Sequence, residues 1–484
     1  MKPKILPILI ICFIVCSVNK LTAACFADNF YLKLYETQNY NKFRVEEIEI
    51  EGNKLTKPDI ILRELTFSKG DNFTIDQLNL TLQRSKENLL NTSLFNFVTI
   101  NSEIKNNSEI YIQIIVEEKW YLWPIPILSH ADRNLAAWIE KKDMSMINYG
   151  LFLHKENFRG RRETLKLKAR FGFKEQFNIL YIKPYIDKFK KHGIAGEISY
   201  NRQKEVSIRT INNKPDYFMH NNEYLMKHLY GSVFYTFRPG LNSSHIISTA
   251  YNIGNVLDTV LMINPYFYME GKKKMSYYSL SYTFIHDLRD SRVYPLRGWY
   301  LNIGLEKIGI GITKNSPDIF WMNLKYRKYG PITKKTYYSL EGSLKKSFGG
   351  FQPYYLKKAL GYDDFLRGFE YYVVDGQDFA LLKSGINYEL VSRKEKQISF
   401  IPSQKFNKIH YTVYLSGYFD MAYVNNKHDI FNNNMSNSYL YSGGLGLSFV
   451  TYYDRVFKIQ YSINNFGEKG IFLHFTSPII SVFY

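Results

Sequence analysis

Apolar and polar side chains alternate in segment after segment from Trp120 to the end of the chain. In one segment Leu165, Leu167, Ala169 and Phe171 hold one set of alternate positions, and lysines and an arginine hold the other. A period of two is typical of β-strands, because successive side chains point to opposite faces. One face is aliphatic and aromatic and the other carries charges and glycines. This pattern favours a membrane barrel with a polar lumen over a soluble sheet.

About sixteen such segments follow one another, and a single-chain bacterial barrel requires an even number. The net charge of +19, with 17% aromatic residues and 41 tyrosines, suits neither a helical membrane protein nor a disordered chain. The predicted strands are Tyr121–Leu128, Met146–Lys155, Leu165–Phe173, Phe177–Ile186, Gly193–Arg202, Tyr230–Arg238, Ile246–Ile253, Tyr277–Asp287, Trp299–Ile308, Phe320–Arg327, Thr336–Lys345, Phe379–Leu390, Tyr411–Ala422, Tyr439–Phe449, Phe457–Ile463 and Gly470–Phe475.

The N-terminus has the pattern of a cleaved secretory signal. Two lysines precede an apolar run from Ile5 to Val18, which is too short to span a bilayer comfortably, and small residues follow. We predict a signal peptide over residues 1–24, with cleavage near Ala24 or Ala27. Cys25 as a lipidated first residue is an alternative, although Thr22 occupies the place where a lipobox would have leucine.

A small α+β domain is predicted between the signal and the barrel, over residues 43–119. Its last strand alternates isoleucine and valine with other residues, so one sheet face is buried under helices. A plain adaptor domain is the alternative interpretation. The expected elements are a strand at Phe43–Ile50, a short helix capped by Thr56 and running through Leu65, a second helix starting at Thr74 or Asp76, and strands at Phe97–Lys105 and Glu109–Val116.

Three motifs lie within the barrel segment. A polar, glycine-rich stretch from about Ser347 to Asp378 contains Leu366-Arg367-Gly368-Phe369. Asp287-Leu288-Arg289-Asp290 and then Tyr294-Pro295-Leu296-Arg297-Gly298 fit a tight turn, because Pro295 presets φ and Gly298 tolerates unusual φ. Tyr418-Phe419-Asp420-Met421-Ala422 lies on a late strand.

These motifs, in this order, resemble those of the BamA/TamA family of outer-membrane assembly and translocation barrels. The Arg-Gly-aromatic segment resembles the family's loop that folds back into the lumen. The Asp287 segment is similar to its D-x-R-D…P-x-x-G turn on the periplasmic side, and Asn157-Phe158-Arg159-Gly160 resembles its N-x-x-G turn. Residues 418–422 approximate its F-x-D-x-G strand and depart from it at Tyr418 and Ala422. The N-terminal domain looks like a POTRA domain, the family's periplasmic module.

The resemblance and the alternation together predict one contact. Counting from Val413 and Leu415 on the lipid face places Tyr418 and Asp420 on the lumen face. A loop folded inward, as in the family, would present the guanidinium of Arg367 there. We therefore predict an Arg367–Asp420 ion pair, with Gly368 allowing close backbone approach and Phe369 filling space beside it. The alternative is a solvated Arg367 at a loop tip on the outer surface.

The resemblance also implies a lateral seam between the first and last strands. Pro124 and Pro126 in the first strand remove two N–H donors from the same edge, which would weaken pairing there. They could instead merely stiffen the linker from the N-terminal domain. The last strand would carry Leu473 and Phe475 at the seam. The residues from there through Tyr484 either extend that strand or form a tail.

The expected fold is thus mainly β, with a transmembrane antiparallel β-barrel of about sixteen strands over residues 120–484 behind the POTRA-like periplasmic domain. The resemblance implies a protein of the bacterial outer membrane that helps to insert and assemble other outer-membrane proteins through the seam. Its expected partners are unfolded outer-membrane clients, the bilayer and lipopolysaccharide, and accessory periplasmic or lipoprotein subunits. A two-partner secretion pore for one polypeptide is the alternative. A diffusion porin would need no POTRA-like domain.

No motif in the sequence indicates an enzyme, a cofactor or a metal. Gly309-Ile310-Gly311 lacks the context of a nucleotide site. The carboxylates of Asp363 and Asp364, and those of Asp287 and Asp290, have no metal-ligand companions at suitable spacing and are expected to be solvated. The lysines at 188, 190 and 191 and at 272–274 are expected in loops that face lipopolysaccharide or simply solubilise the surface, without nucleic acid.

Overall fold

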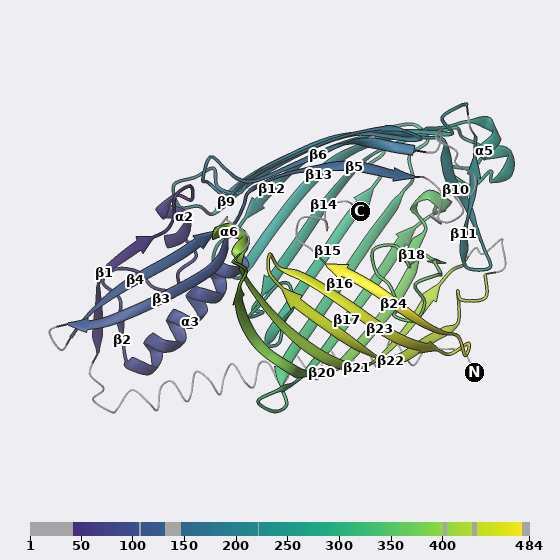
Figure 1. Cartoon of the computed structure of the whole chain (residues 1–484). Helices are drawn as coiled ribbons and strands as arrows, with labels where there is room; N and C mark the ends of the chain where they lie inside the picture. Colours follow the sequence, from purple (N-terminus) through teal and green to yellow (C-terminus); the bar gives the residue numbers. More distant parts are fainter. Residues whose placement is uncertain are drawn as a thin grey trace. The chain divides into compact units, whose positions relative to one another are not determined.

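The computed structural model describes residues 42–105, 108–130, 147–220, 222–399, 404–427 and 433–476 (Figure 1). The predicted signal peptide, Cys25 and the residues after Thr476 lie outside this range. No helix among the described residues is long and apolar enough to cross a membrane.

The N-terminal domain contains a four-stranded sheet in the order β2–β1–β4–β3. Thr74 begins its longer helix with a reciprocal cap, since the Thr74 N–H donates to Gln77 Oε1 at 3.1 Å and the Gln77 N–H to Thr74 Oγ1 at 3.4 Å. The shorter helix begins later than predicted, because Lys57 before a proline is extended. The elements are β1 (Phe43–Glu51), α2 (Pro58–Leu62), β2 (Asn72–Phe73), α3 (Ile75–Asn91), β3 (Phe95–Lys105) and β4 (Glu109–Glu118).

The rest of the chain forms one sixteen-stranded antiparallel sheet that curls into the wall of a barrel (Figure 1). Every strand predicted from the alternation is present. The two edge strands, β5 and β24, are not paired with each other. The strands in order are β5 (Leu122–His130), β6 (Ile147–Phe158), β7 (Glu163–Gly172), β8 (Lys174–Lys183), β9 (His192–Gln203), β12 (Met226–Phe237), β13 (Ser243–Val256), β14 (Lys274–Asp287), β15 (Gly298–Ile308), β16 (Ile319–Pro331), β17 (Thr336–Gly349), β20 (Asp378–Gln397), β21 (Lys408–Asn425), β22 (Tyr439–Thr451), β23 (Arg455–Asn464) and β24 (Lys469–Thr476).

Alternation along each strand separates an apolar exterior from a polar interior. On β22, the side chain of Leu445 is exposed on the outer face, while Ser442 and Ser448 are buried on the inner face. On β24, Ile471 and Leu473 are exposed in the same way. Large exposed apolar side chains would be unfavourable in water, so this exterior suits a lipid environment.

Because neighbouring strands are antiparallel, connections alternate between two ends of the sheet. We call the end at which β5 begins the proximal end, and the opposite end the distal end. The β8–β9 turn with Lys188, Lys190 and Lys191 is proximal, whereas Lys272–Lys274 precede β14 at the distal end. The two lysine groups therefore cannot both face lipopolysaccharide, and at least one of them is left with the alternative role of solubilising the surface.

At the distal end, one segment that the alternation did not predict crosses the lumen. A hairpin of β10 (Glu205–Ile211) and β11 (Lys214–Met219) extends between β9 and β12. At its tip, the Asn213 N–H donates to Asn433 Oδ1 at 2.9 Å, and the Asn213 side chain donates to Asn434 Oδ1 at 2.6 Å. Asn433 and Asn434 belong to the β21–β22 connection, which six strands separate from β12. The hairpin thus reaches across the barrel.

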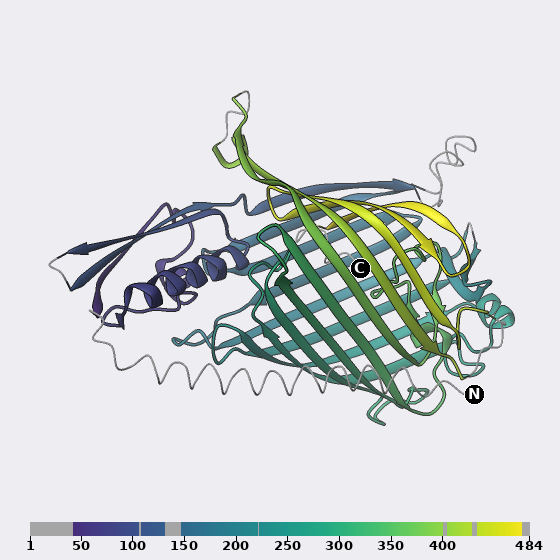
Figure 2. The ribbon, with the colours of Figure 1, turned by 90° about the horizontal axis from the view of Figure 1, so that it is seen from below.

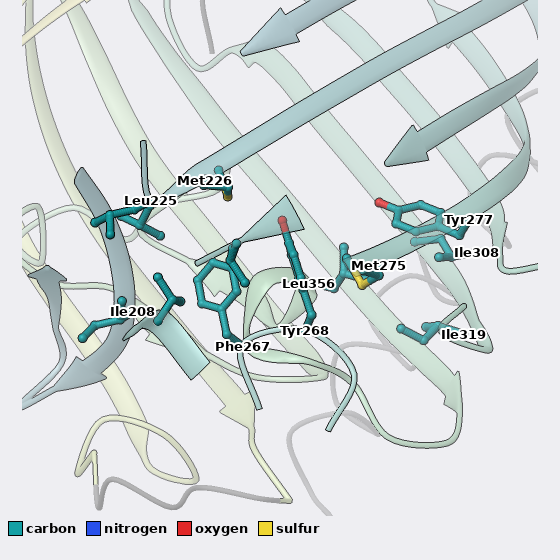
Figure 3. Close-up of a cluster of buried hydrophobic side chains, with 13 residues drawn as sticks. Ile208, Leu225, Met226, Phe267, Tyr268, Met275, Tyr277, Ile308, Ile319 and Leu356 are labelled. Carbon is teal, nitrogen blue, oxygen red and sulfur yellow. The ribbon is translucent and has the colours of Figure 1, made fainter. Parts of the chain in front are cut away.

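Apolar side chains fill the space beneath this hairpin (Figure 3). They come from the hairpin, from α5 (Asp258–Ile263), from the distal ends of barrel strands and from the β17–β20 connection. We call this cluster the distal cap. Its buried members are Val206, Ile208, Leu225, Met226, Val256, Val260, Phe267, Tyr268, Met275, Tyr277, Ile308, Ile319 and Leu356.

At the proximal end, the β20–β21 hairpin is longer than its neighbours and projects beyond them (Figure 2). Pairing of β20 with β17 ends at Tyr388, so the residues of β20 beyond it pair only with β21. A short helix, α6 (Gln404–Asn407), lies at the tip of this hairpin.

Candidate functional site: the lumenal loop and the seam

The connection between β17 and β20, residues 350–377, lies against the inner wall of the barrel and is called here the lumenal loop. It contains a 3-10 turn at Tyr354–Leu356 and two short paired strands, β18 (Lys358–Ala359–Leu360) and β19 (Val374–Asp375). Within it, the Tyr362 hydroxyl donates to Asp375 Oδ1 at 2.8 Å. Burial, together with the adjacent Asp375 carboxylate, raises the pKa of Tyr362 well above its usual range, so the hydroxyl keeps its proton.

Arg367, in this loop, forms a two-pronged ion pair with Asp420 on β21. Arg367 Nε donates to Asp420 Oδ2 at 2.7 Å, and Arg367 Nη2 donates to Asp420 Oδ1. Asp420 has 0% solvent exposure, and the guanidinium also donates to the Ser384 carbonyl at 3.1 Å. The ring of Tyr418 lies under the guanidinium, 3.9 Å from its central carbon. The structure thus brings together Tyr418 and Asp420, which the alternation places on the lumen face, and Arg367, which the family resemblance places beside them.

Gly368 lets the loop backbone approach the wall closely. Its φ is +82°, and an added Cβ would lie 3.1 Å from the Cβ of Ser442 and 3.2 Å from that of Ser462. The backbone carbonyls of Arg367 and Gly368 both accept hydrogen bonds from side chains of the wall. Ser442 Oγ donates to the Arg367 carbonyl, and Asn464 Nδ2 donates to the Gly368 carbonyl at 3.0 Å. A larger residue at 368 would press on both serines and would be strained by the positive φ, so glycine suits this close approach.

Leu366 and Phe369 secure the loop through apolar contacts. Both are buried in a cluster with barrel residues, including Leu381 on β20 and Ala422 on β21. Ala422 occupies the place where the resembled motif has glycine, and its small side chain, 1% exposed, fits within this cluster. Ion pair, backbone bonds and apolar packing together fix the four-residue segment on the inner faces of β20–β23.

The loop also contacts the seam strand β24, which the sequence did not lead us to expect. The Phe365 ring stacks on the imidazole of His474, with centroids 5.3 Å apart and planes at 17°. Glu370 Oε1 lies 3.3 Å from His474 Nε2. Within the described residues, neither the Glu370 carboxylate nor this nitrogen makes a well-aligned hydrogen bond, so the contact is an ion pair whenever the imidazole is protonated. The one sequence signal for this contact was His474, a polar residue among apolar neighbours in the predicted last strand.

Two of the four carboxylates that we expected to be solvated, those of Asp364 and Asp287, are paired with cations instead, whereas Asp363 is exposed as expected. Asp364 lies 2.9 Å from Lys325 Nζ in the lumen. Asp287 accepts two bonds from Arg289, at 2.8 Å from Nε and 2.9 Å from Nη2. No group of three or more histidine, cysteine, aspartate or glutamate side chains in the described part of the chain could hold a metal ion.

The Asp287 segment forms the proximal turn between β14 and β15. The Asp290 carboxylate accepts bonds from the N–H groups of Ser291 and Leu296, at 2.8 and 3.1 Å, and so ties the two ends of the turn together. Gly298 has φ +93°, and an added Cβ would lie 2.0 Å from the Leu288 carbonyl oxygen. Pro295 lies in the same turn and lines a lumenal cavity of about 370 Å³ with Arg367.

The first strand turns its prolines toward the open edge of the sheet. Its pairing with β6 runs without a break through Pro124 and Pro126. Because proline has no N–H, this ladder must use the backbone groups of the intervening residues. The groups of Pro124 and Pro126 therefore point away from β6. The free edge of β5 keeps its carbonyls but lacks two donors.

The free edge of β24 has a full set of donors. The Asn464 N–H donates to the Glu468 carbonyl at 3.1 Å, which sets the hydrogen-bonding phase of the β23–β24 ladder. In that phase the backbone groups of Ile471, Leu473 and Phe475 point to the free edge, and their side chains are exposed on the outer face. Two strands with unequal hydrogen-bonding capacity thus face the gap.

Two family models match this sequence. The POTRA model, described as "Surface antigen variable number repeat", matches residues 43–119, and the "Omp85 superfamily domain" matches residues 157–451. Among solved structures, CdiB from Escherichia coli matches with a TM-score of 0.50 at 11% identity, over 90% of this chain and 75% of that chain. BamA from Haemophilus ducreyi lacking POTRA domains 1-3 matches with a TM-score of 0.48 at 17% identity, over 90% and 84%. At such identities the likeness to CdiB concerns the fold alone. No curated protein is significantly similar in sequence.

Proposed function

The chain belongs to the Omp85 superfamily, and from that premise we propose that it assists the insertion and assembly of other outer-membrane β-barrel proteins through the seam between β5 and β24. It does so without catalysing a reaction. The distal end faces the cell exterior, and the POTRA domain lies in the periplasm, where unfolded clients arrive.

The physical problem is the backbone of the client. An unfolded strand that enters lipid exposes N–H and C=O groups, each of which costs several kcal/mol when unpaired. A strand edge within the membrane solves this problem if it offers partners for those groups. The observation that carries the proposal is the open edge of β5 opposite β24, with Pro124 and Pro126 turned toward the gap. Closure between these two strands would lack two hydrogen bonds, so a client strand competes with it more easily.

The POTRA domain would handle clients before they reach the seam. Its sheet ends on β3, whose outer half is exposed, and an extended peptide can add backbone hydrogen bonds to such an edge with little regard to sequence. This weak, sequence-tolerant binding suits many different clients.

A secretion pore of the two-partner type is the second candidate, because the same architecture could pass one dedicated polypeptide. Its path would lead through the lumen, where the β10–β11 hairpin crosses to the β21–β22 connection. Such a polypeptide would have to displace the distal cap, whereas lateral insertion leaves it in place. For this reason we favour insertion.

Depletion of the protein from its host distinguishes the candidates. We expect many outer-membrane barrel proteins to fall together in quantitative mass spectrometry of membrane fractions, with inner-membrane proteins as the internal control. Restoring the parent protein should restore them. Loss of a single secreted protein from the medium, with barrels unchanged, would indicate the secretion pore. An unchanged proteome in both fractions would contradict both functions.

A further inference from the structure

Four aromatic residues connect the start of the first strand to the far side of the seam. Trp123 lies on β5, and Trp120 shortly precedes it. The Trp123 ring packs edge-on against Tyr453, with centroids 5.4 Å apart, and against Phe406 at 6.5 Å. Trp120 lies 6.3 Å from Phe406, and Phe406 stacks on Tyr453 at 5.6 Å and 22°. The four rings thus form one continuous group.

The partners of the two tryptophans belong to neither edge strand of the gap. Phe406 lies in α6, between β20 and β21, and Tyr453 lies in the β22–β23 turn. Both connections are proximal, as is the start of β5. β5 and β24 share no backbone ladder, so this aromatic group joins the two sides of the seam by side-chain contacts from beyond β24.

The tight β22–β23 turn presents Tyr453 to the two tryptophans. Tyr453 and Asp454 have φ of +58° and +56°, a left-handed conformation that is costly for a bulky residue such as tyrosine. Tyr453 is nevertheless 6% exposed, and its hydroxyl accepts a bond from the Trp120 N–H at 3.1 Å. The Arg455 guanidinium lies 5.9 Å from the Trp123 ring. Two central residues with positive φ are usual in tight hairpin turns, so the turn sets this backbone and thereby presents the tyrosine ring to the two tryptophans.

We propose that Trp120, Trp123, Phe406 and Tyr453 form a clasp that keeps the proximal end of the seam together while the strand edges above it separate. The inference rests on the proposed lateral seam and adds how that seam opens. Ring contacts tolerate a change of angle, whereas a backbone ladder requires fixed register. The seam therefore opens as a wedge, narrow at the clasp and wide at the distal end. The four aromatic residues are positioning residues that keep the edge of β5 aligned for an incoming strand.

The test compares separations at the two ends of the seam in the full-length protein in lipid vesicles. Spin labels at Leu122 and Phe475 report the proximal end, and labels at Leu128 and Ile471 report the distal end, all on outward-facing positions. In the parent protein we expect a narrow distance distribution at the proximal end and a broad one at the distal end. Equal widths at the two ends would overturn the wedge.

Trp123→Ala combined with Tyr453→Ala should broaden the proximal distribution until it resembles the distal one. Trp123→Phe with Tyr453→Phe keeps the rings and should preserve the narrow distribution. Phe177→Ala removes an outward ring remote from the seam and serves as the matched control. Heat-modifiability on gels identifies the variants that still fold. If the alanine pair does not fold, Trp123→Ala alone is measured in its place and should also broaden the proximal distribution.

A proximal distribution that stays narrow in the folded alanine variant would overturn the clasp, as would broadening in the phenylalanine pair equal to that in the alanine pair. Client levels in the same strains are measured separately and bear on the proposed function. Broadening without any effect on clients would thus support the clasp and contradict insertion through the seam.

Discussion

A single fully buried carboxylate, Asp420, organises the contact between the lumenal loop and the barrel wall. It accepts two bonds from Arg367 and lies directly across from Lys383 in the β20–β21 register. Burying a charge is costly unless an opposite charge pairs with it, so Arg367 and Asp420 each offset the desolvation cost of the other. The loop's position therefore depends on one ion pair, with Gly368 and the apolar neighbours of Phe369 supporting it.

Arg367→Ala should lower the thermal stability of the barrel. Removing one partner of a buried pair typically costs about 3–5 kcal/mol, because the remaining charge is left unpaired. The temperature of the gel mobility shift measures this loss, and client assembly should fall with it. Arg367→Asp with Asp420→Arg should recover part of both.

Arg393→Ala is the control for this substitution, since Arg393 forms an exposed pair with Glu395 on the same barrel at 3.5 Å. Exposed pairs contribute at most about 1 kcal/mol, so its mobility shift should change little. Equal stability of Arg367→Ala and the parent would show that the pair does not hold the loop.

At the scale of the elements, the two edge strands differ in what their backbones can bond. β24 presents a donor and an acceptor at each outward position, whereas β5 lacks two donors at Pro124 and Pro126. On its inner side β24 is also held by the lumenal loop, through the contacts of His474 with Phe365 and Glu370. The seam thus has one secured strand and one strand with limited pairing.

Pro124→Val with Pro126→Val should strengthen closure of the seam. The change returns two N–H groups to the edge, and at about 0.5–1.5 kcal/mol for each hydrogen bond the barrel gains roughly 1–3 kcal/mol. The mobility-shift temperature should rise, and the rate of client assembly in reconstituted vesicles should fall. Leu128→Val is the control, because Leu128 already has an N–H at that edge. Unchanged stability of the proline variant would mean that the prolines do not limit pairing.

At the scale of the whole molecule, the distal cap covers the distal end of the lumen. The β10–β11 hairpin bonds to the opposite wall through Asn213, and the Val373 N–H in the lumenal loop donates to the Asn213 carbonyl at 2.9 Å. Three separate connections thus meet over the lumen above an apolar cluster. Such a seal suits a protein that acts through its side wall rather than through a central channel.

Replacing the hairpin Glu205–Met219 with a short glycine–serine linker should open the lumen to ions. Planar-bilayer recordings should show large, steady conductance for this variant and little for the parent, because the apolar cluster excludes water. Asn213→Gly, which removes the side-chain bonds of the tip and tolerates the positive φ of +58° at this position, should give brief openings. Identical recordings for all three proteins would contradict a sealed lumen.

The sequence by itself determined the elements whose signal is local. A period of two identified all sixteen barrel strands, since lipid on one side and water on the other impose opposite polarity on adjacent residues. The same alternation placed Tyr418 and Asp420 on the inner face. The β10–β11 hairpin and α5 escaped prediction because they pack within the lumen, where no lipid boundary imposes a period. The expected solvation of Asp287 and Asp364 was wrong, because their cationic partners are set by the turn and by the packed loop.

Apart from the Arg367–Asp420 pair, which the family resemblance and the alternation together predicted, only the tertiary structure decided which distant residues meet. Nothing in the neighbourhood of Phe406 or Tyr453 connects them to Trp123, since barrel curvature alone brings the β20–β23 turns beside the start of β5. The sequence shows that Pro124 and Pro126 lie on the same edge of their strand, but not which neighbouring strand that edge faces. Only the pairing of β5 with β6 shows that this edge faces the seam. Side-chain chemistry is local and the sequence specifies it, whereas partners across the barrel depend on how sixteen strands curl and register.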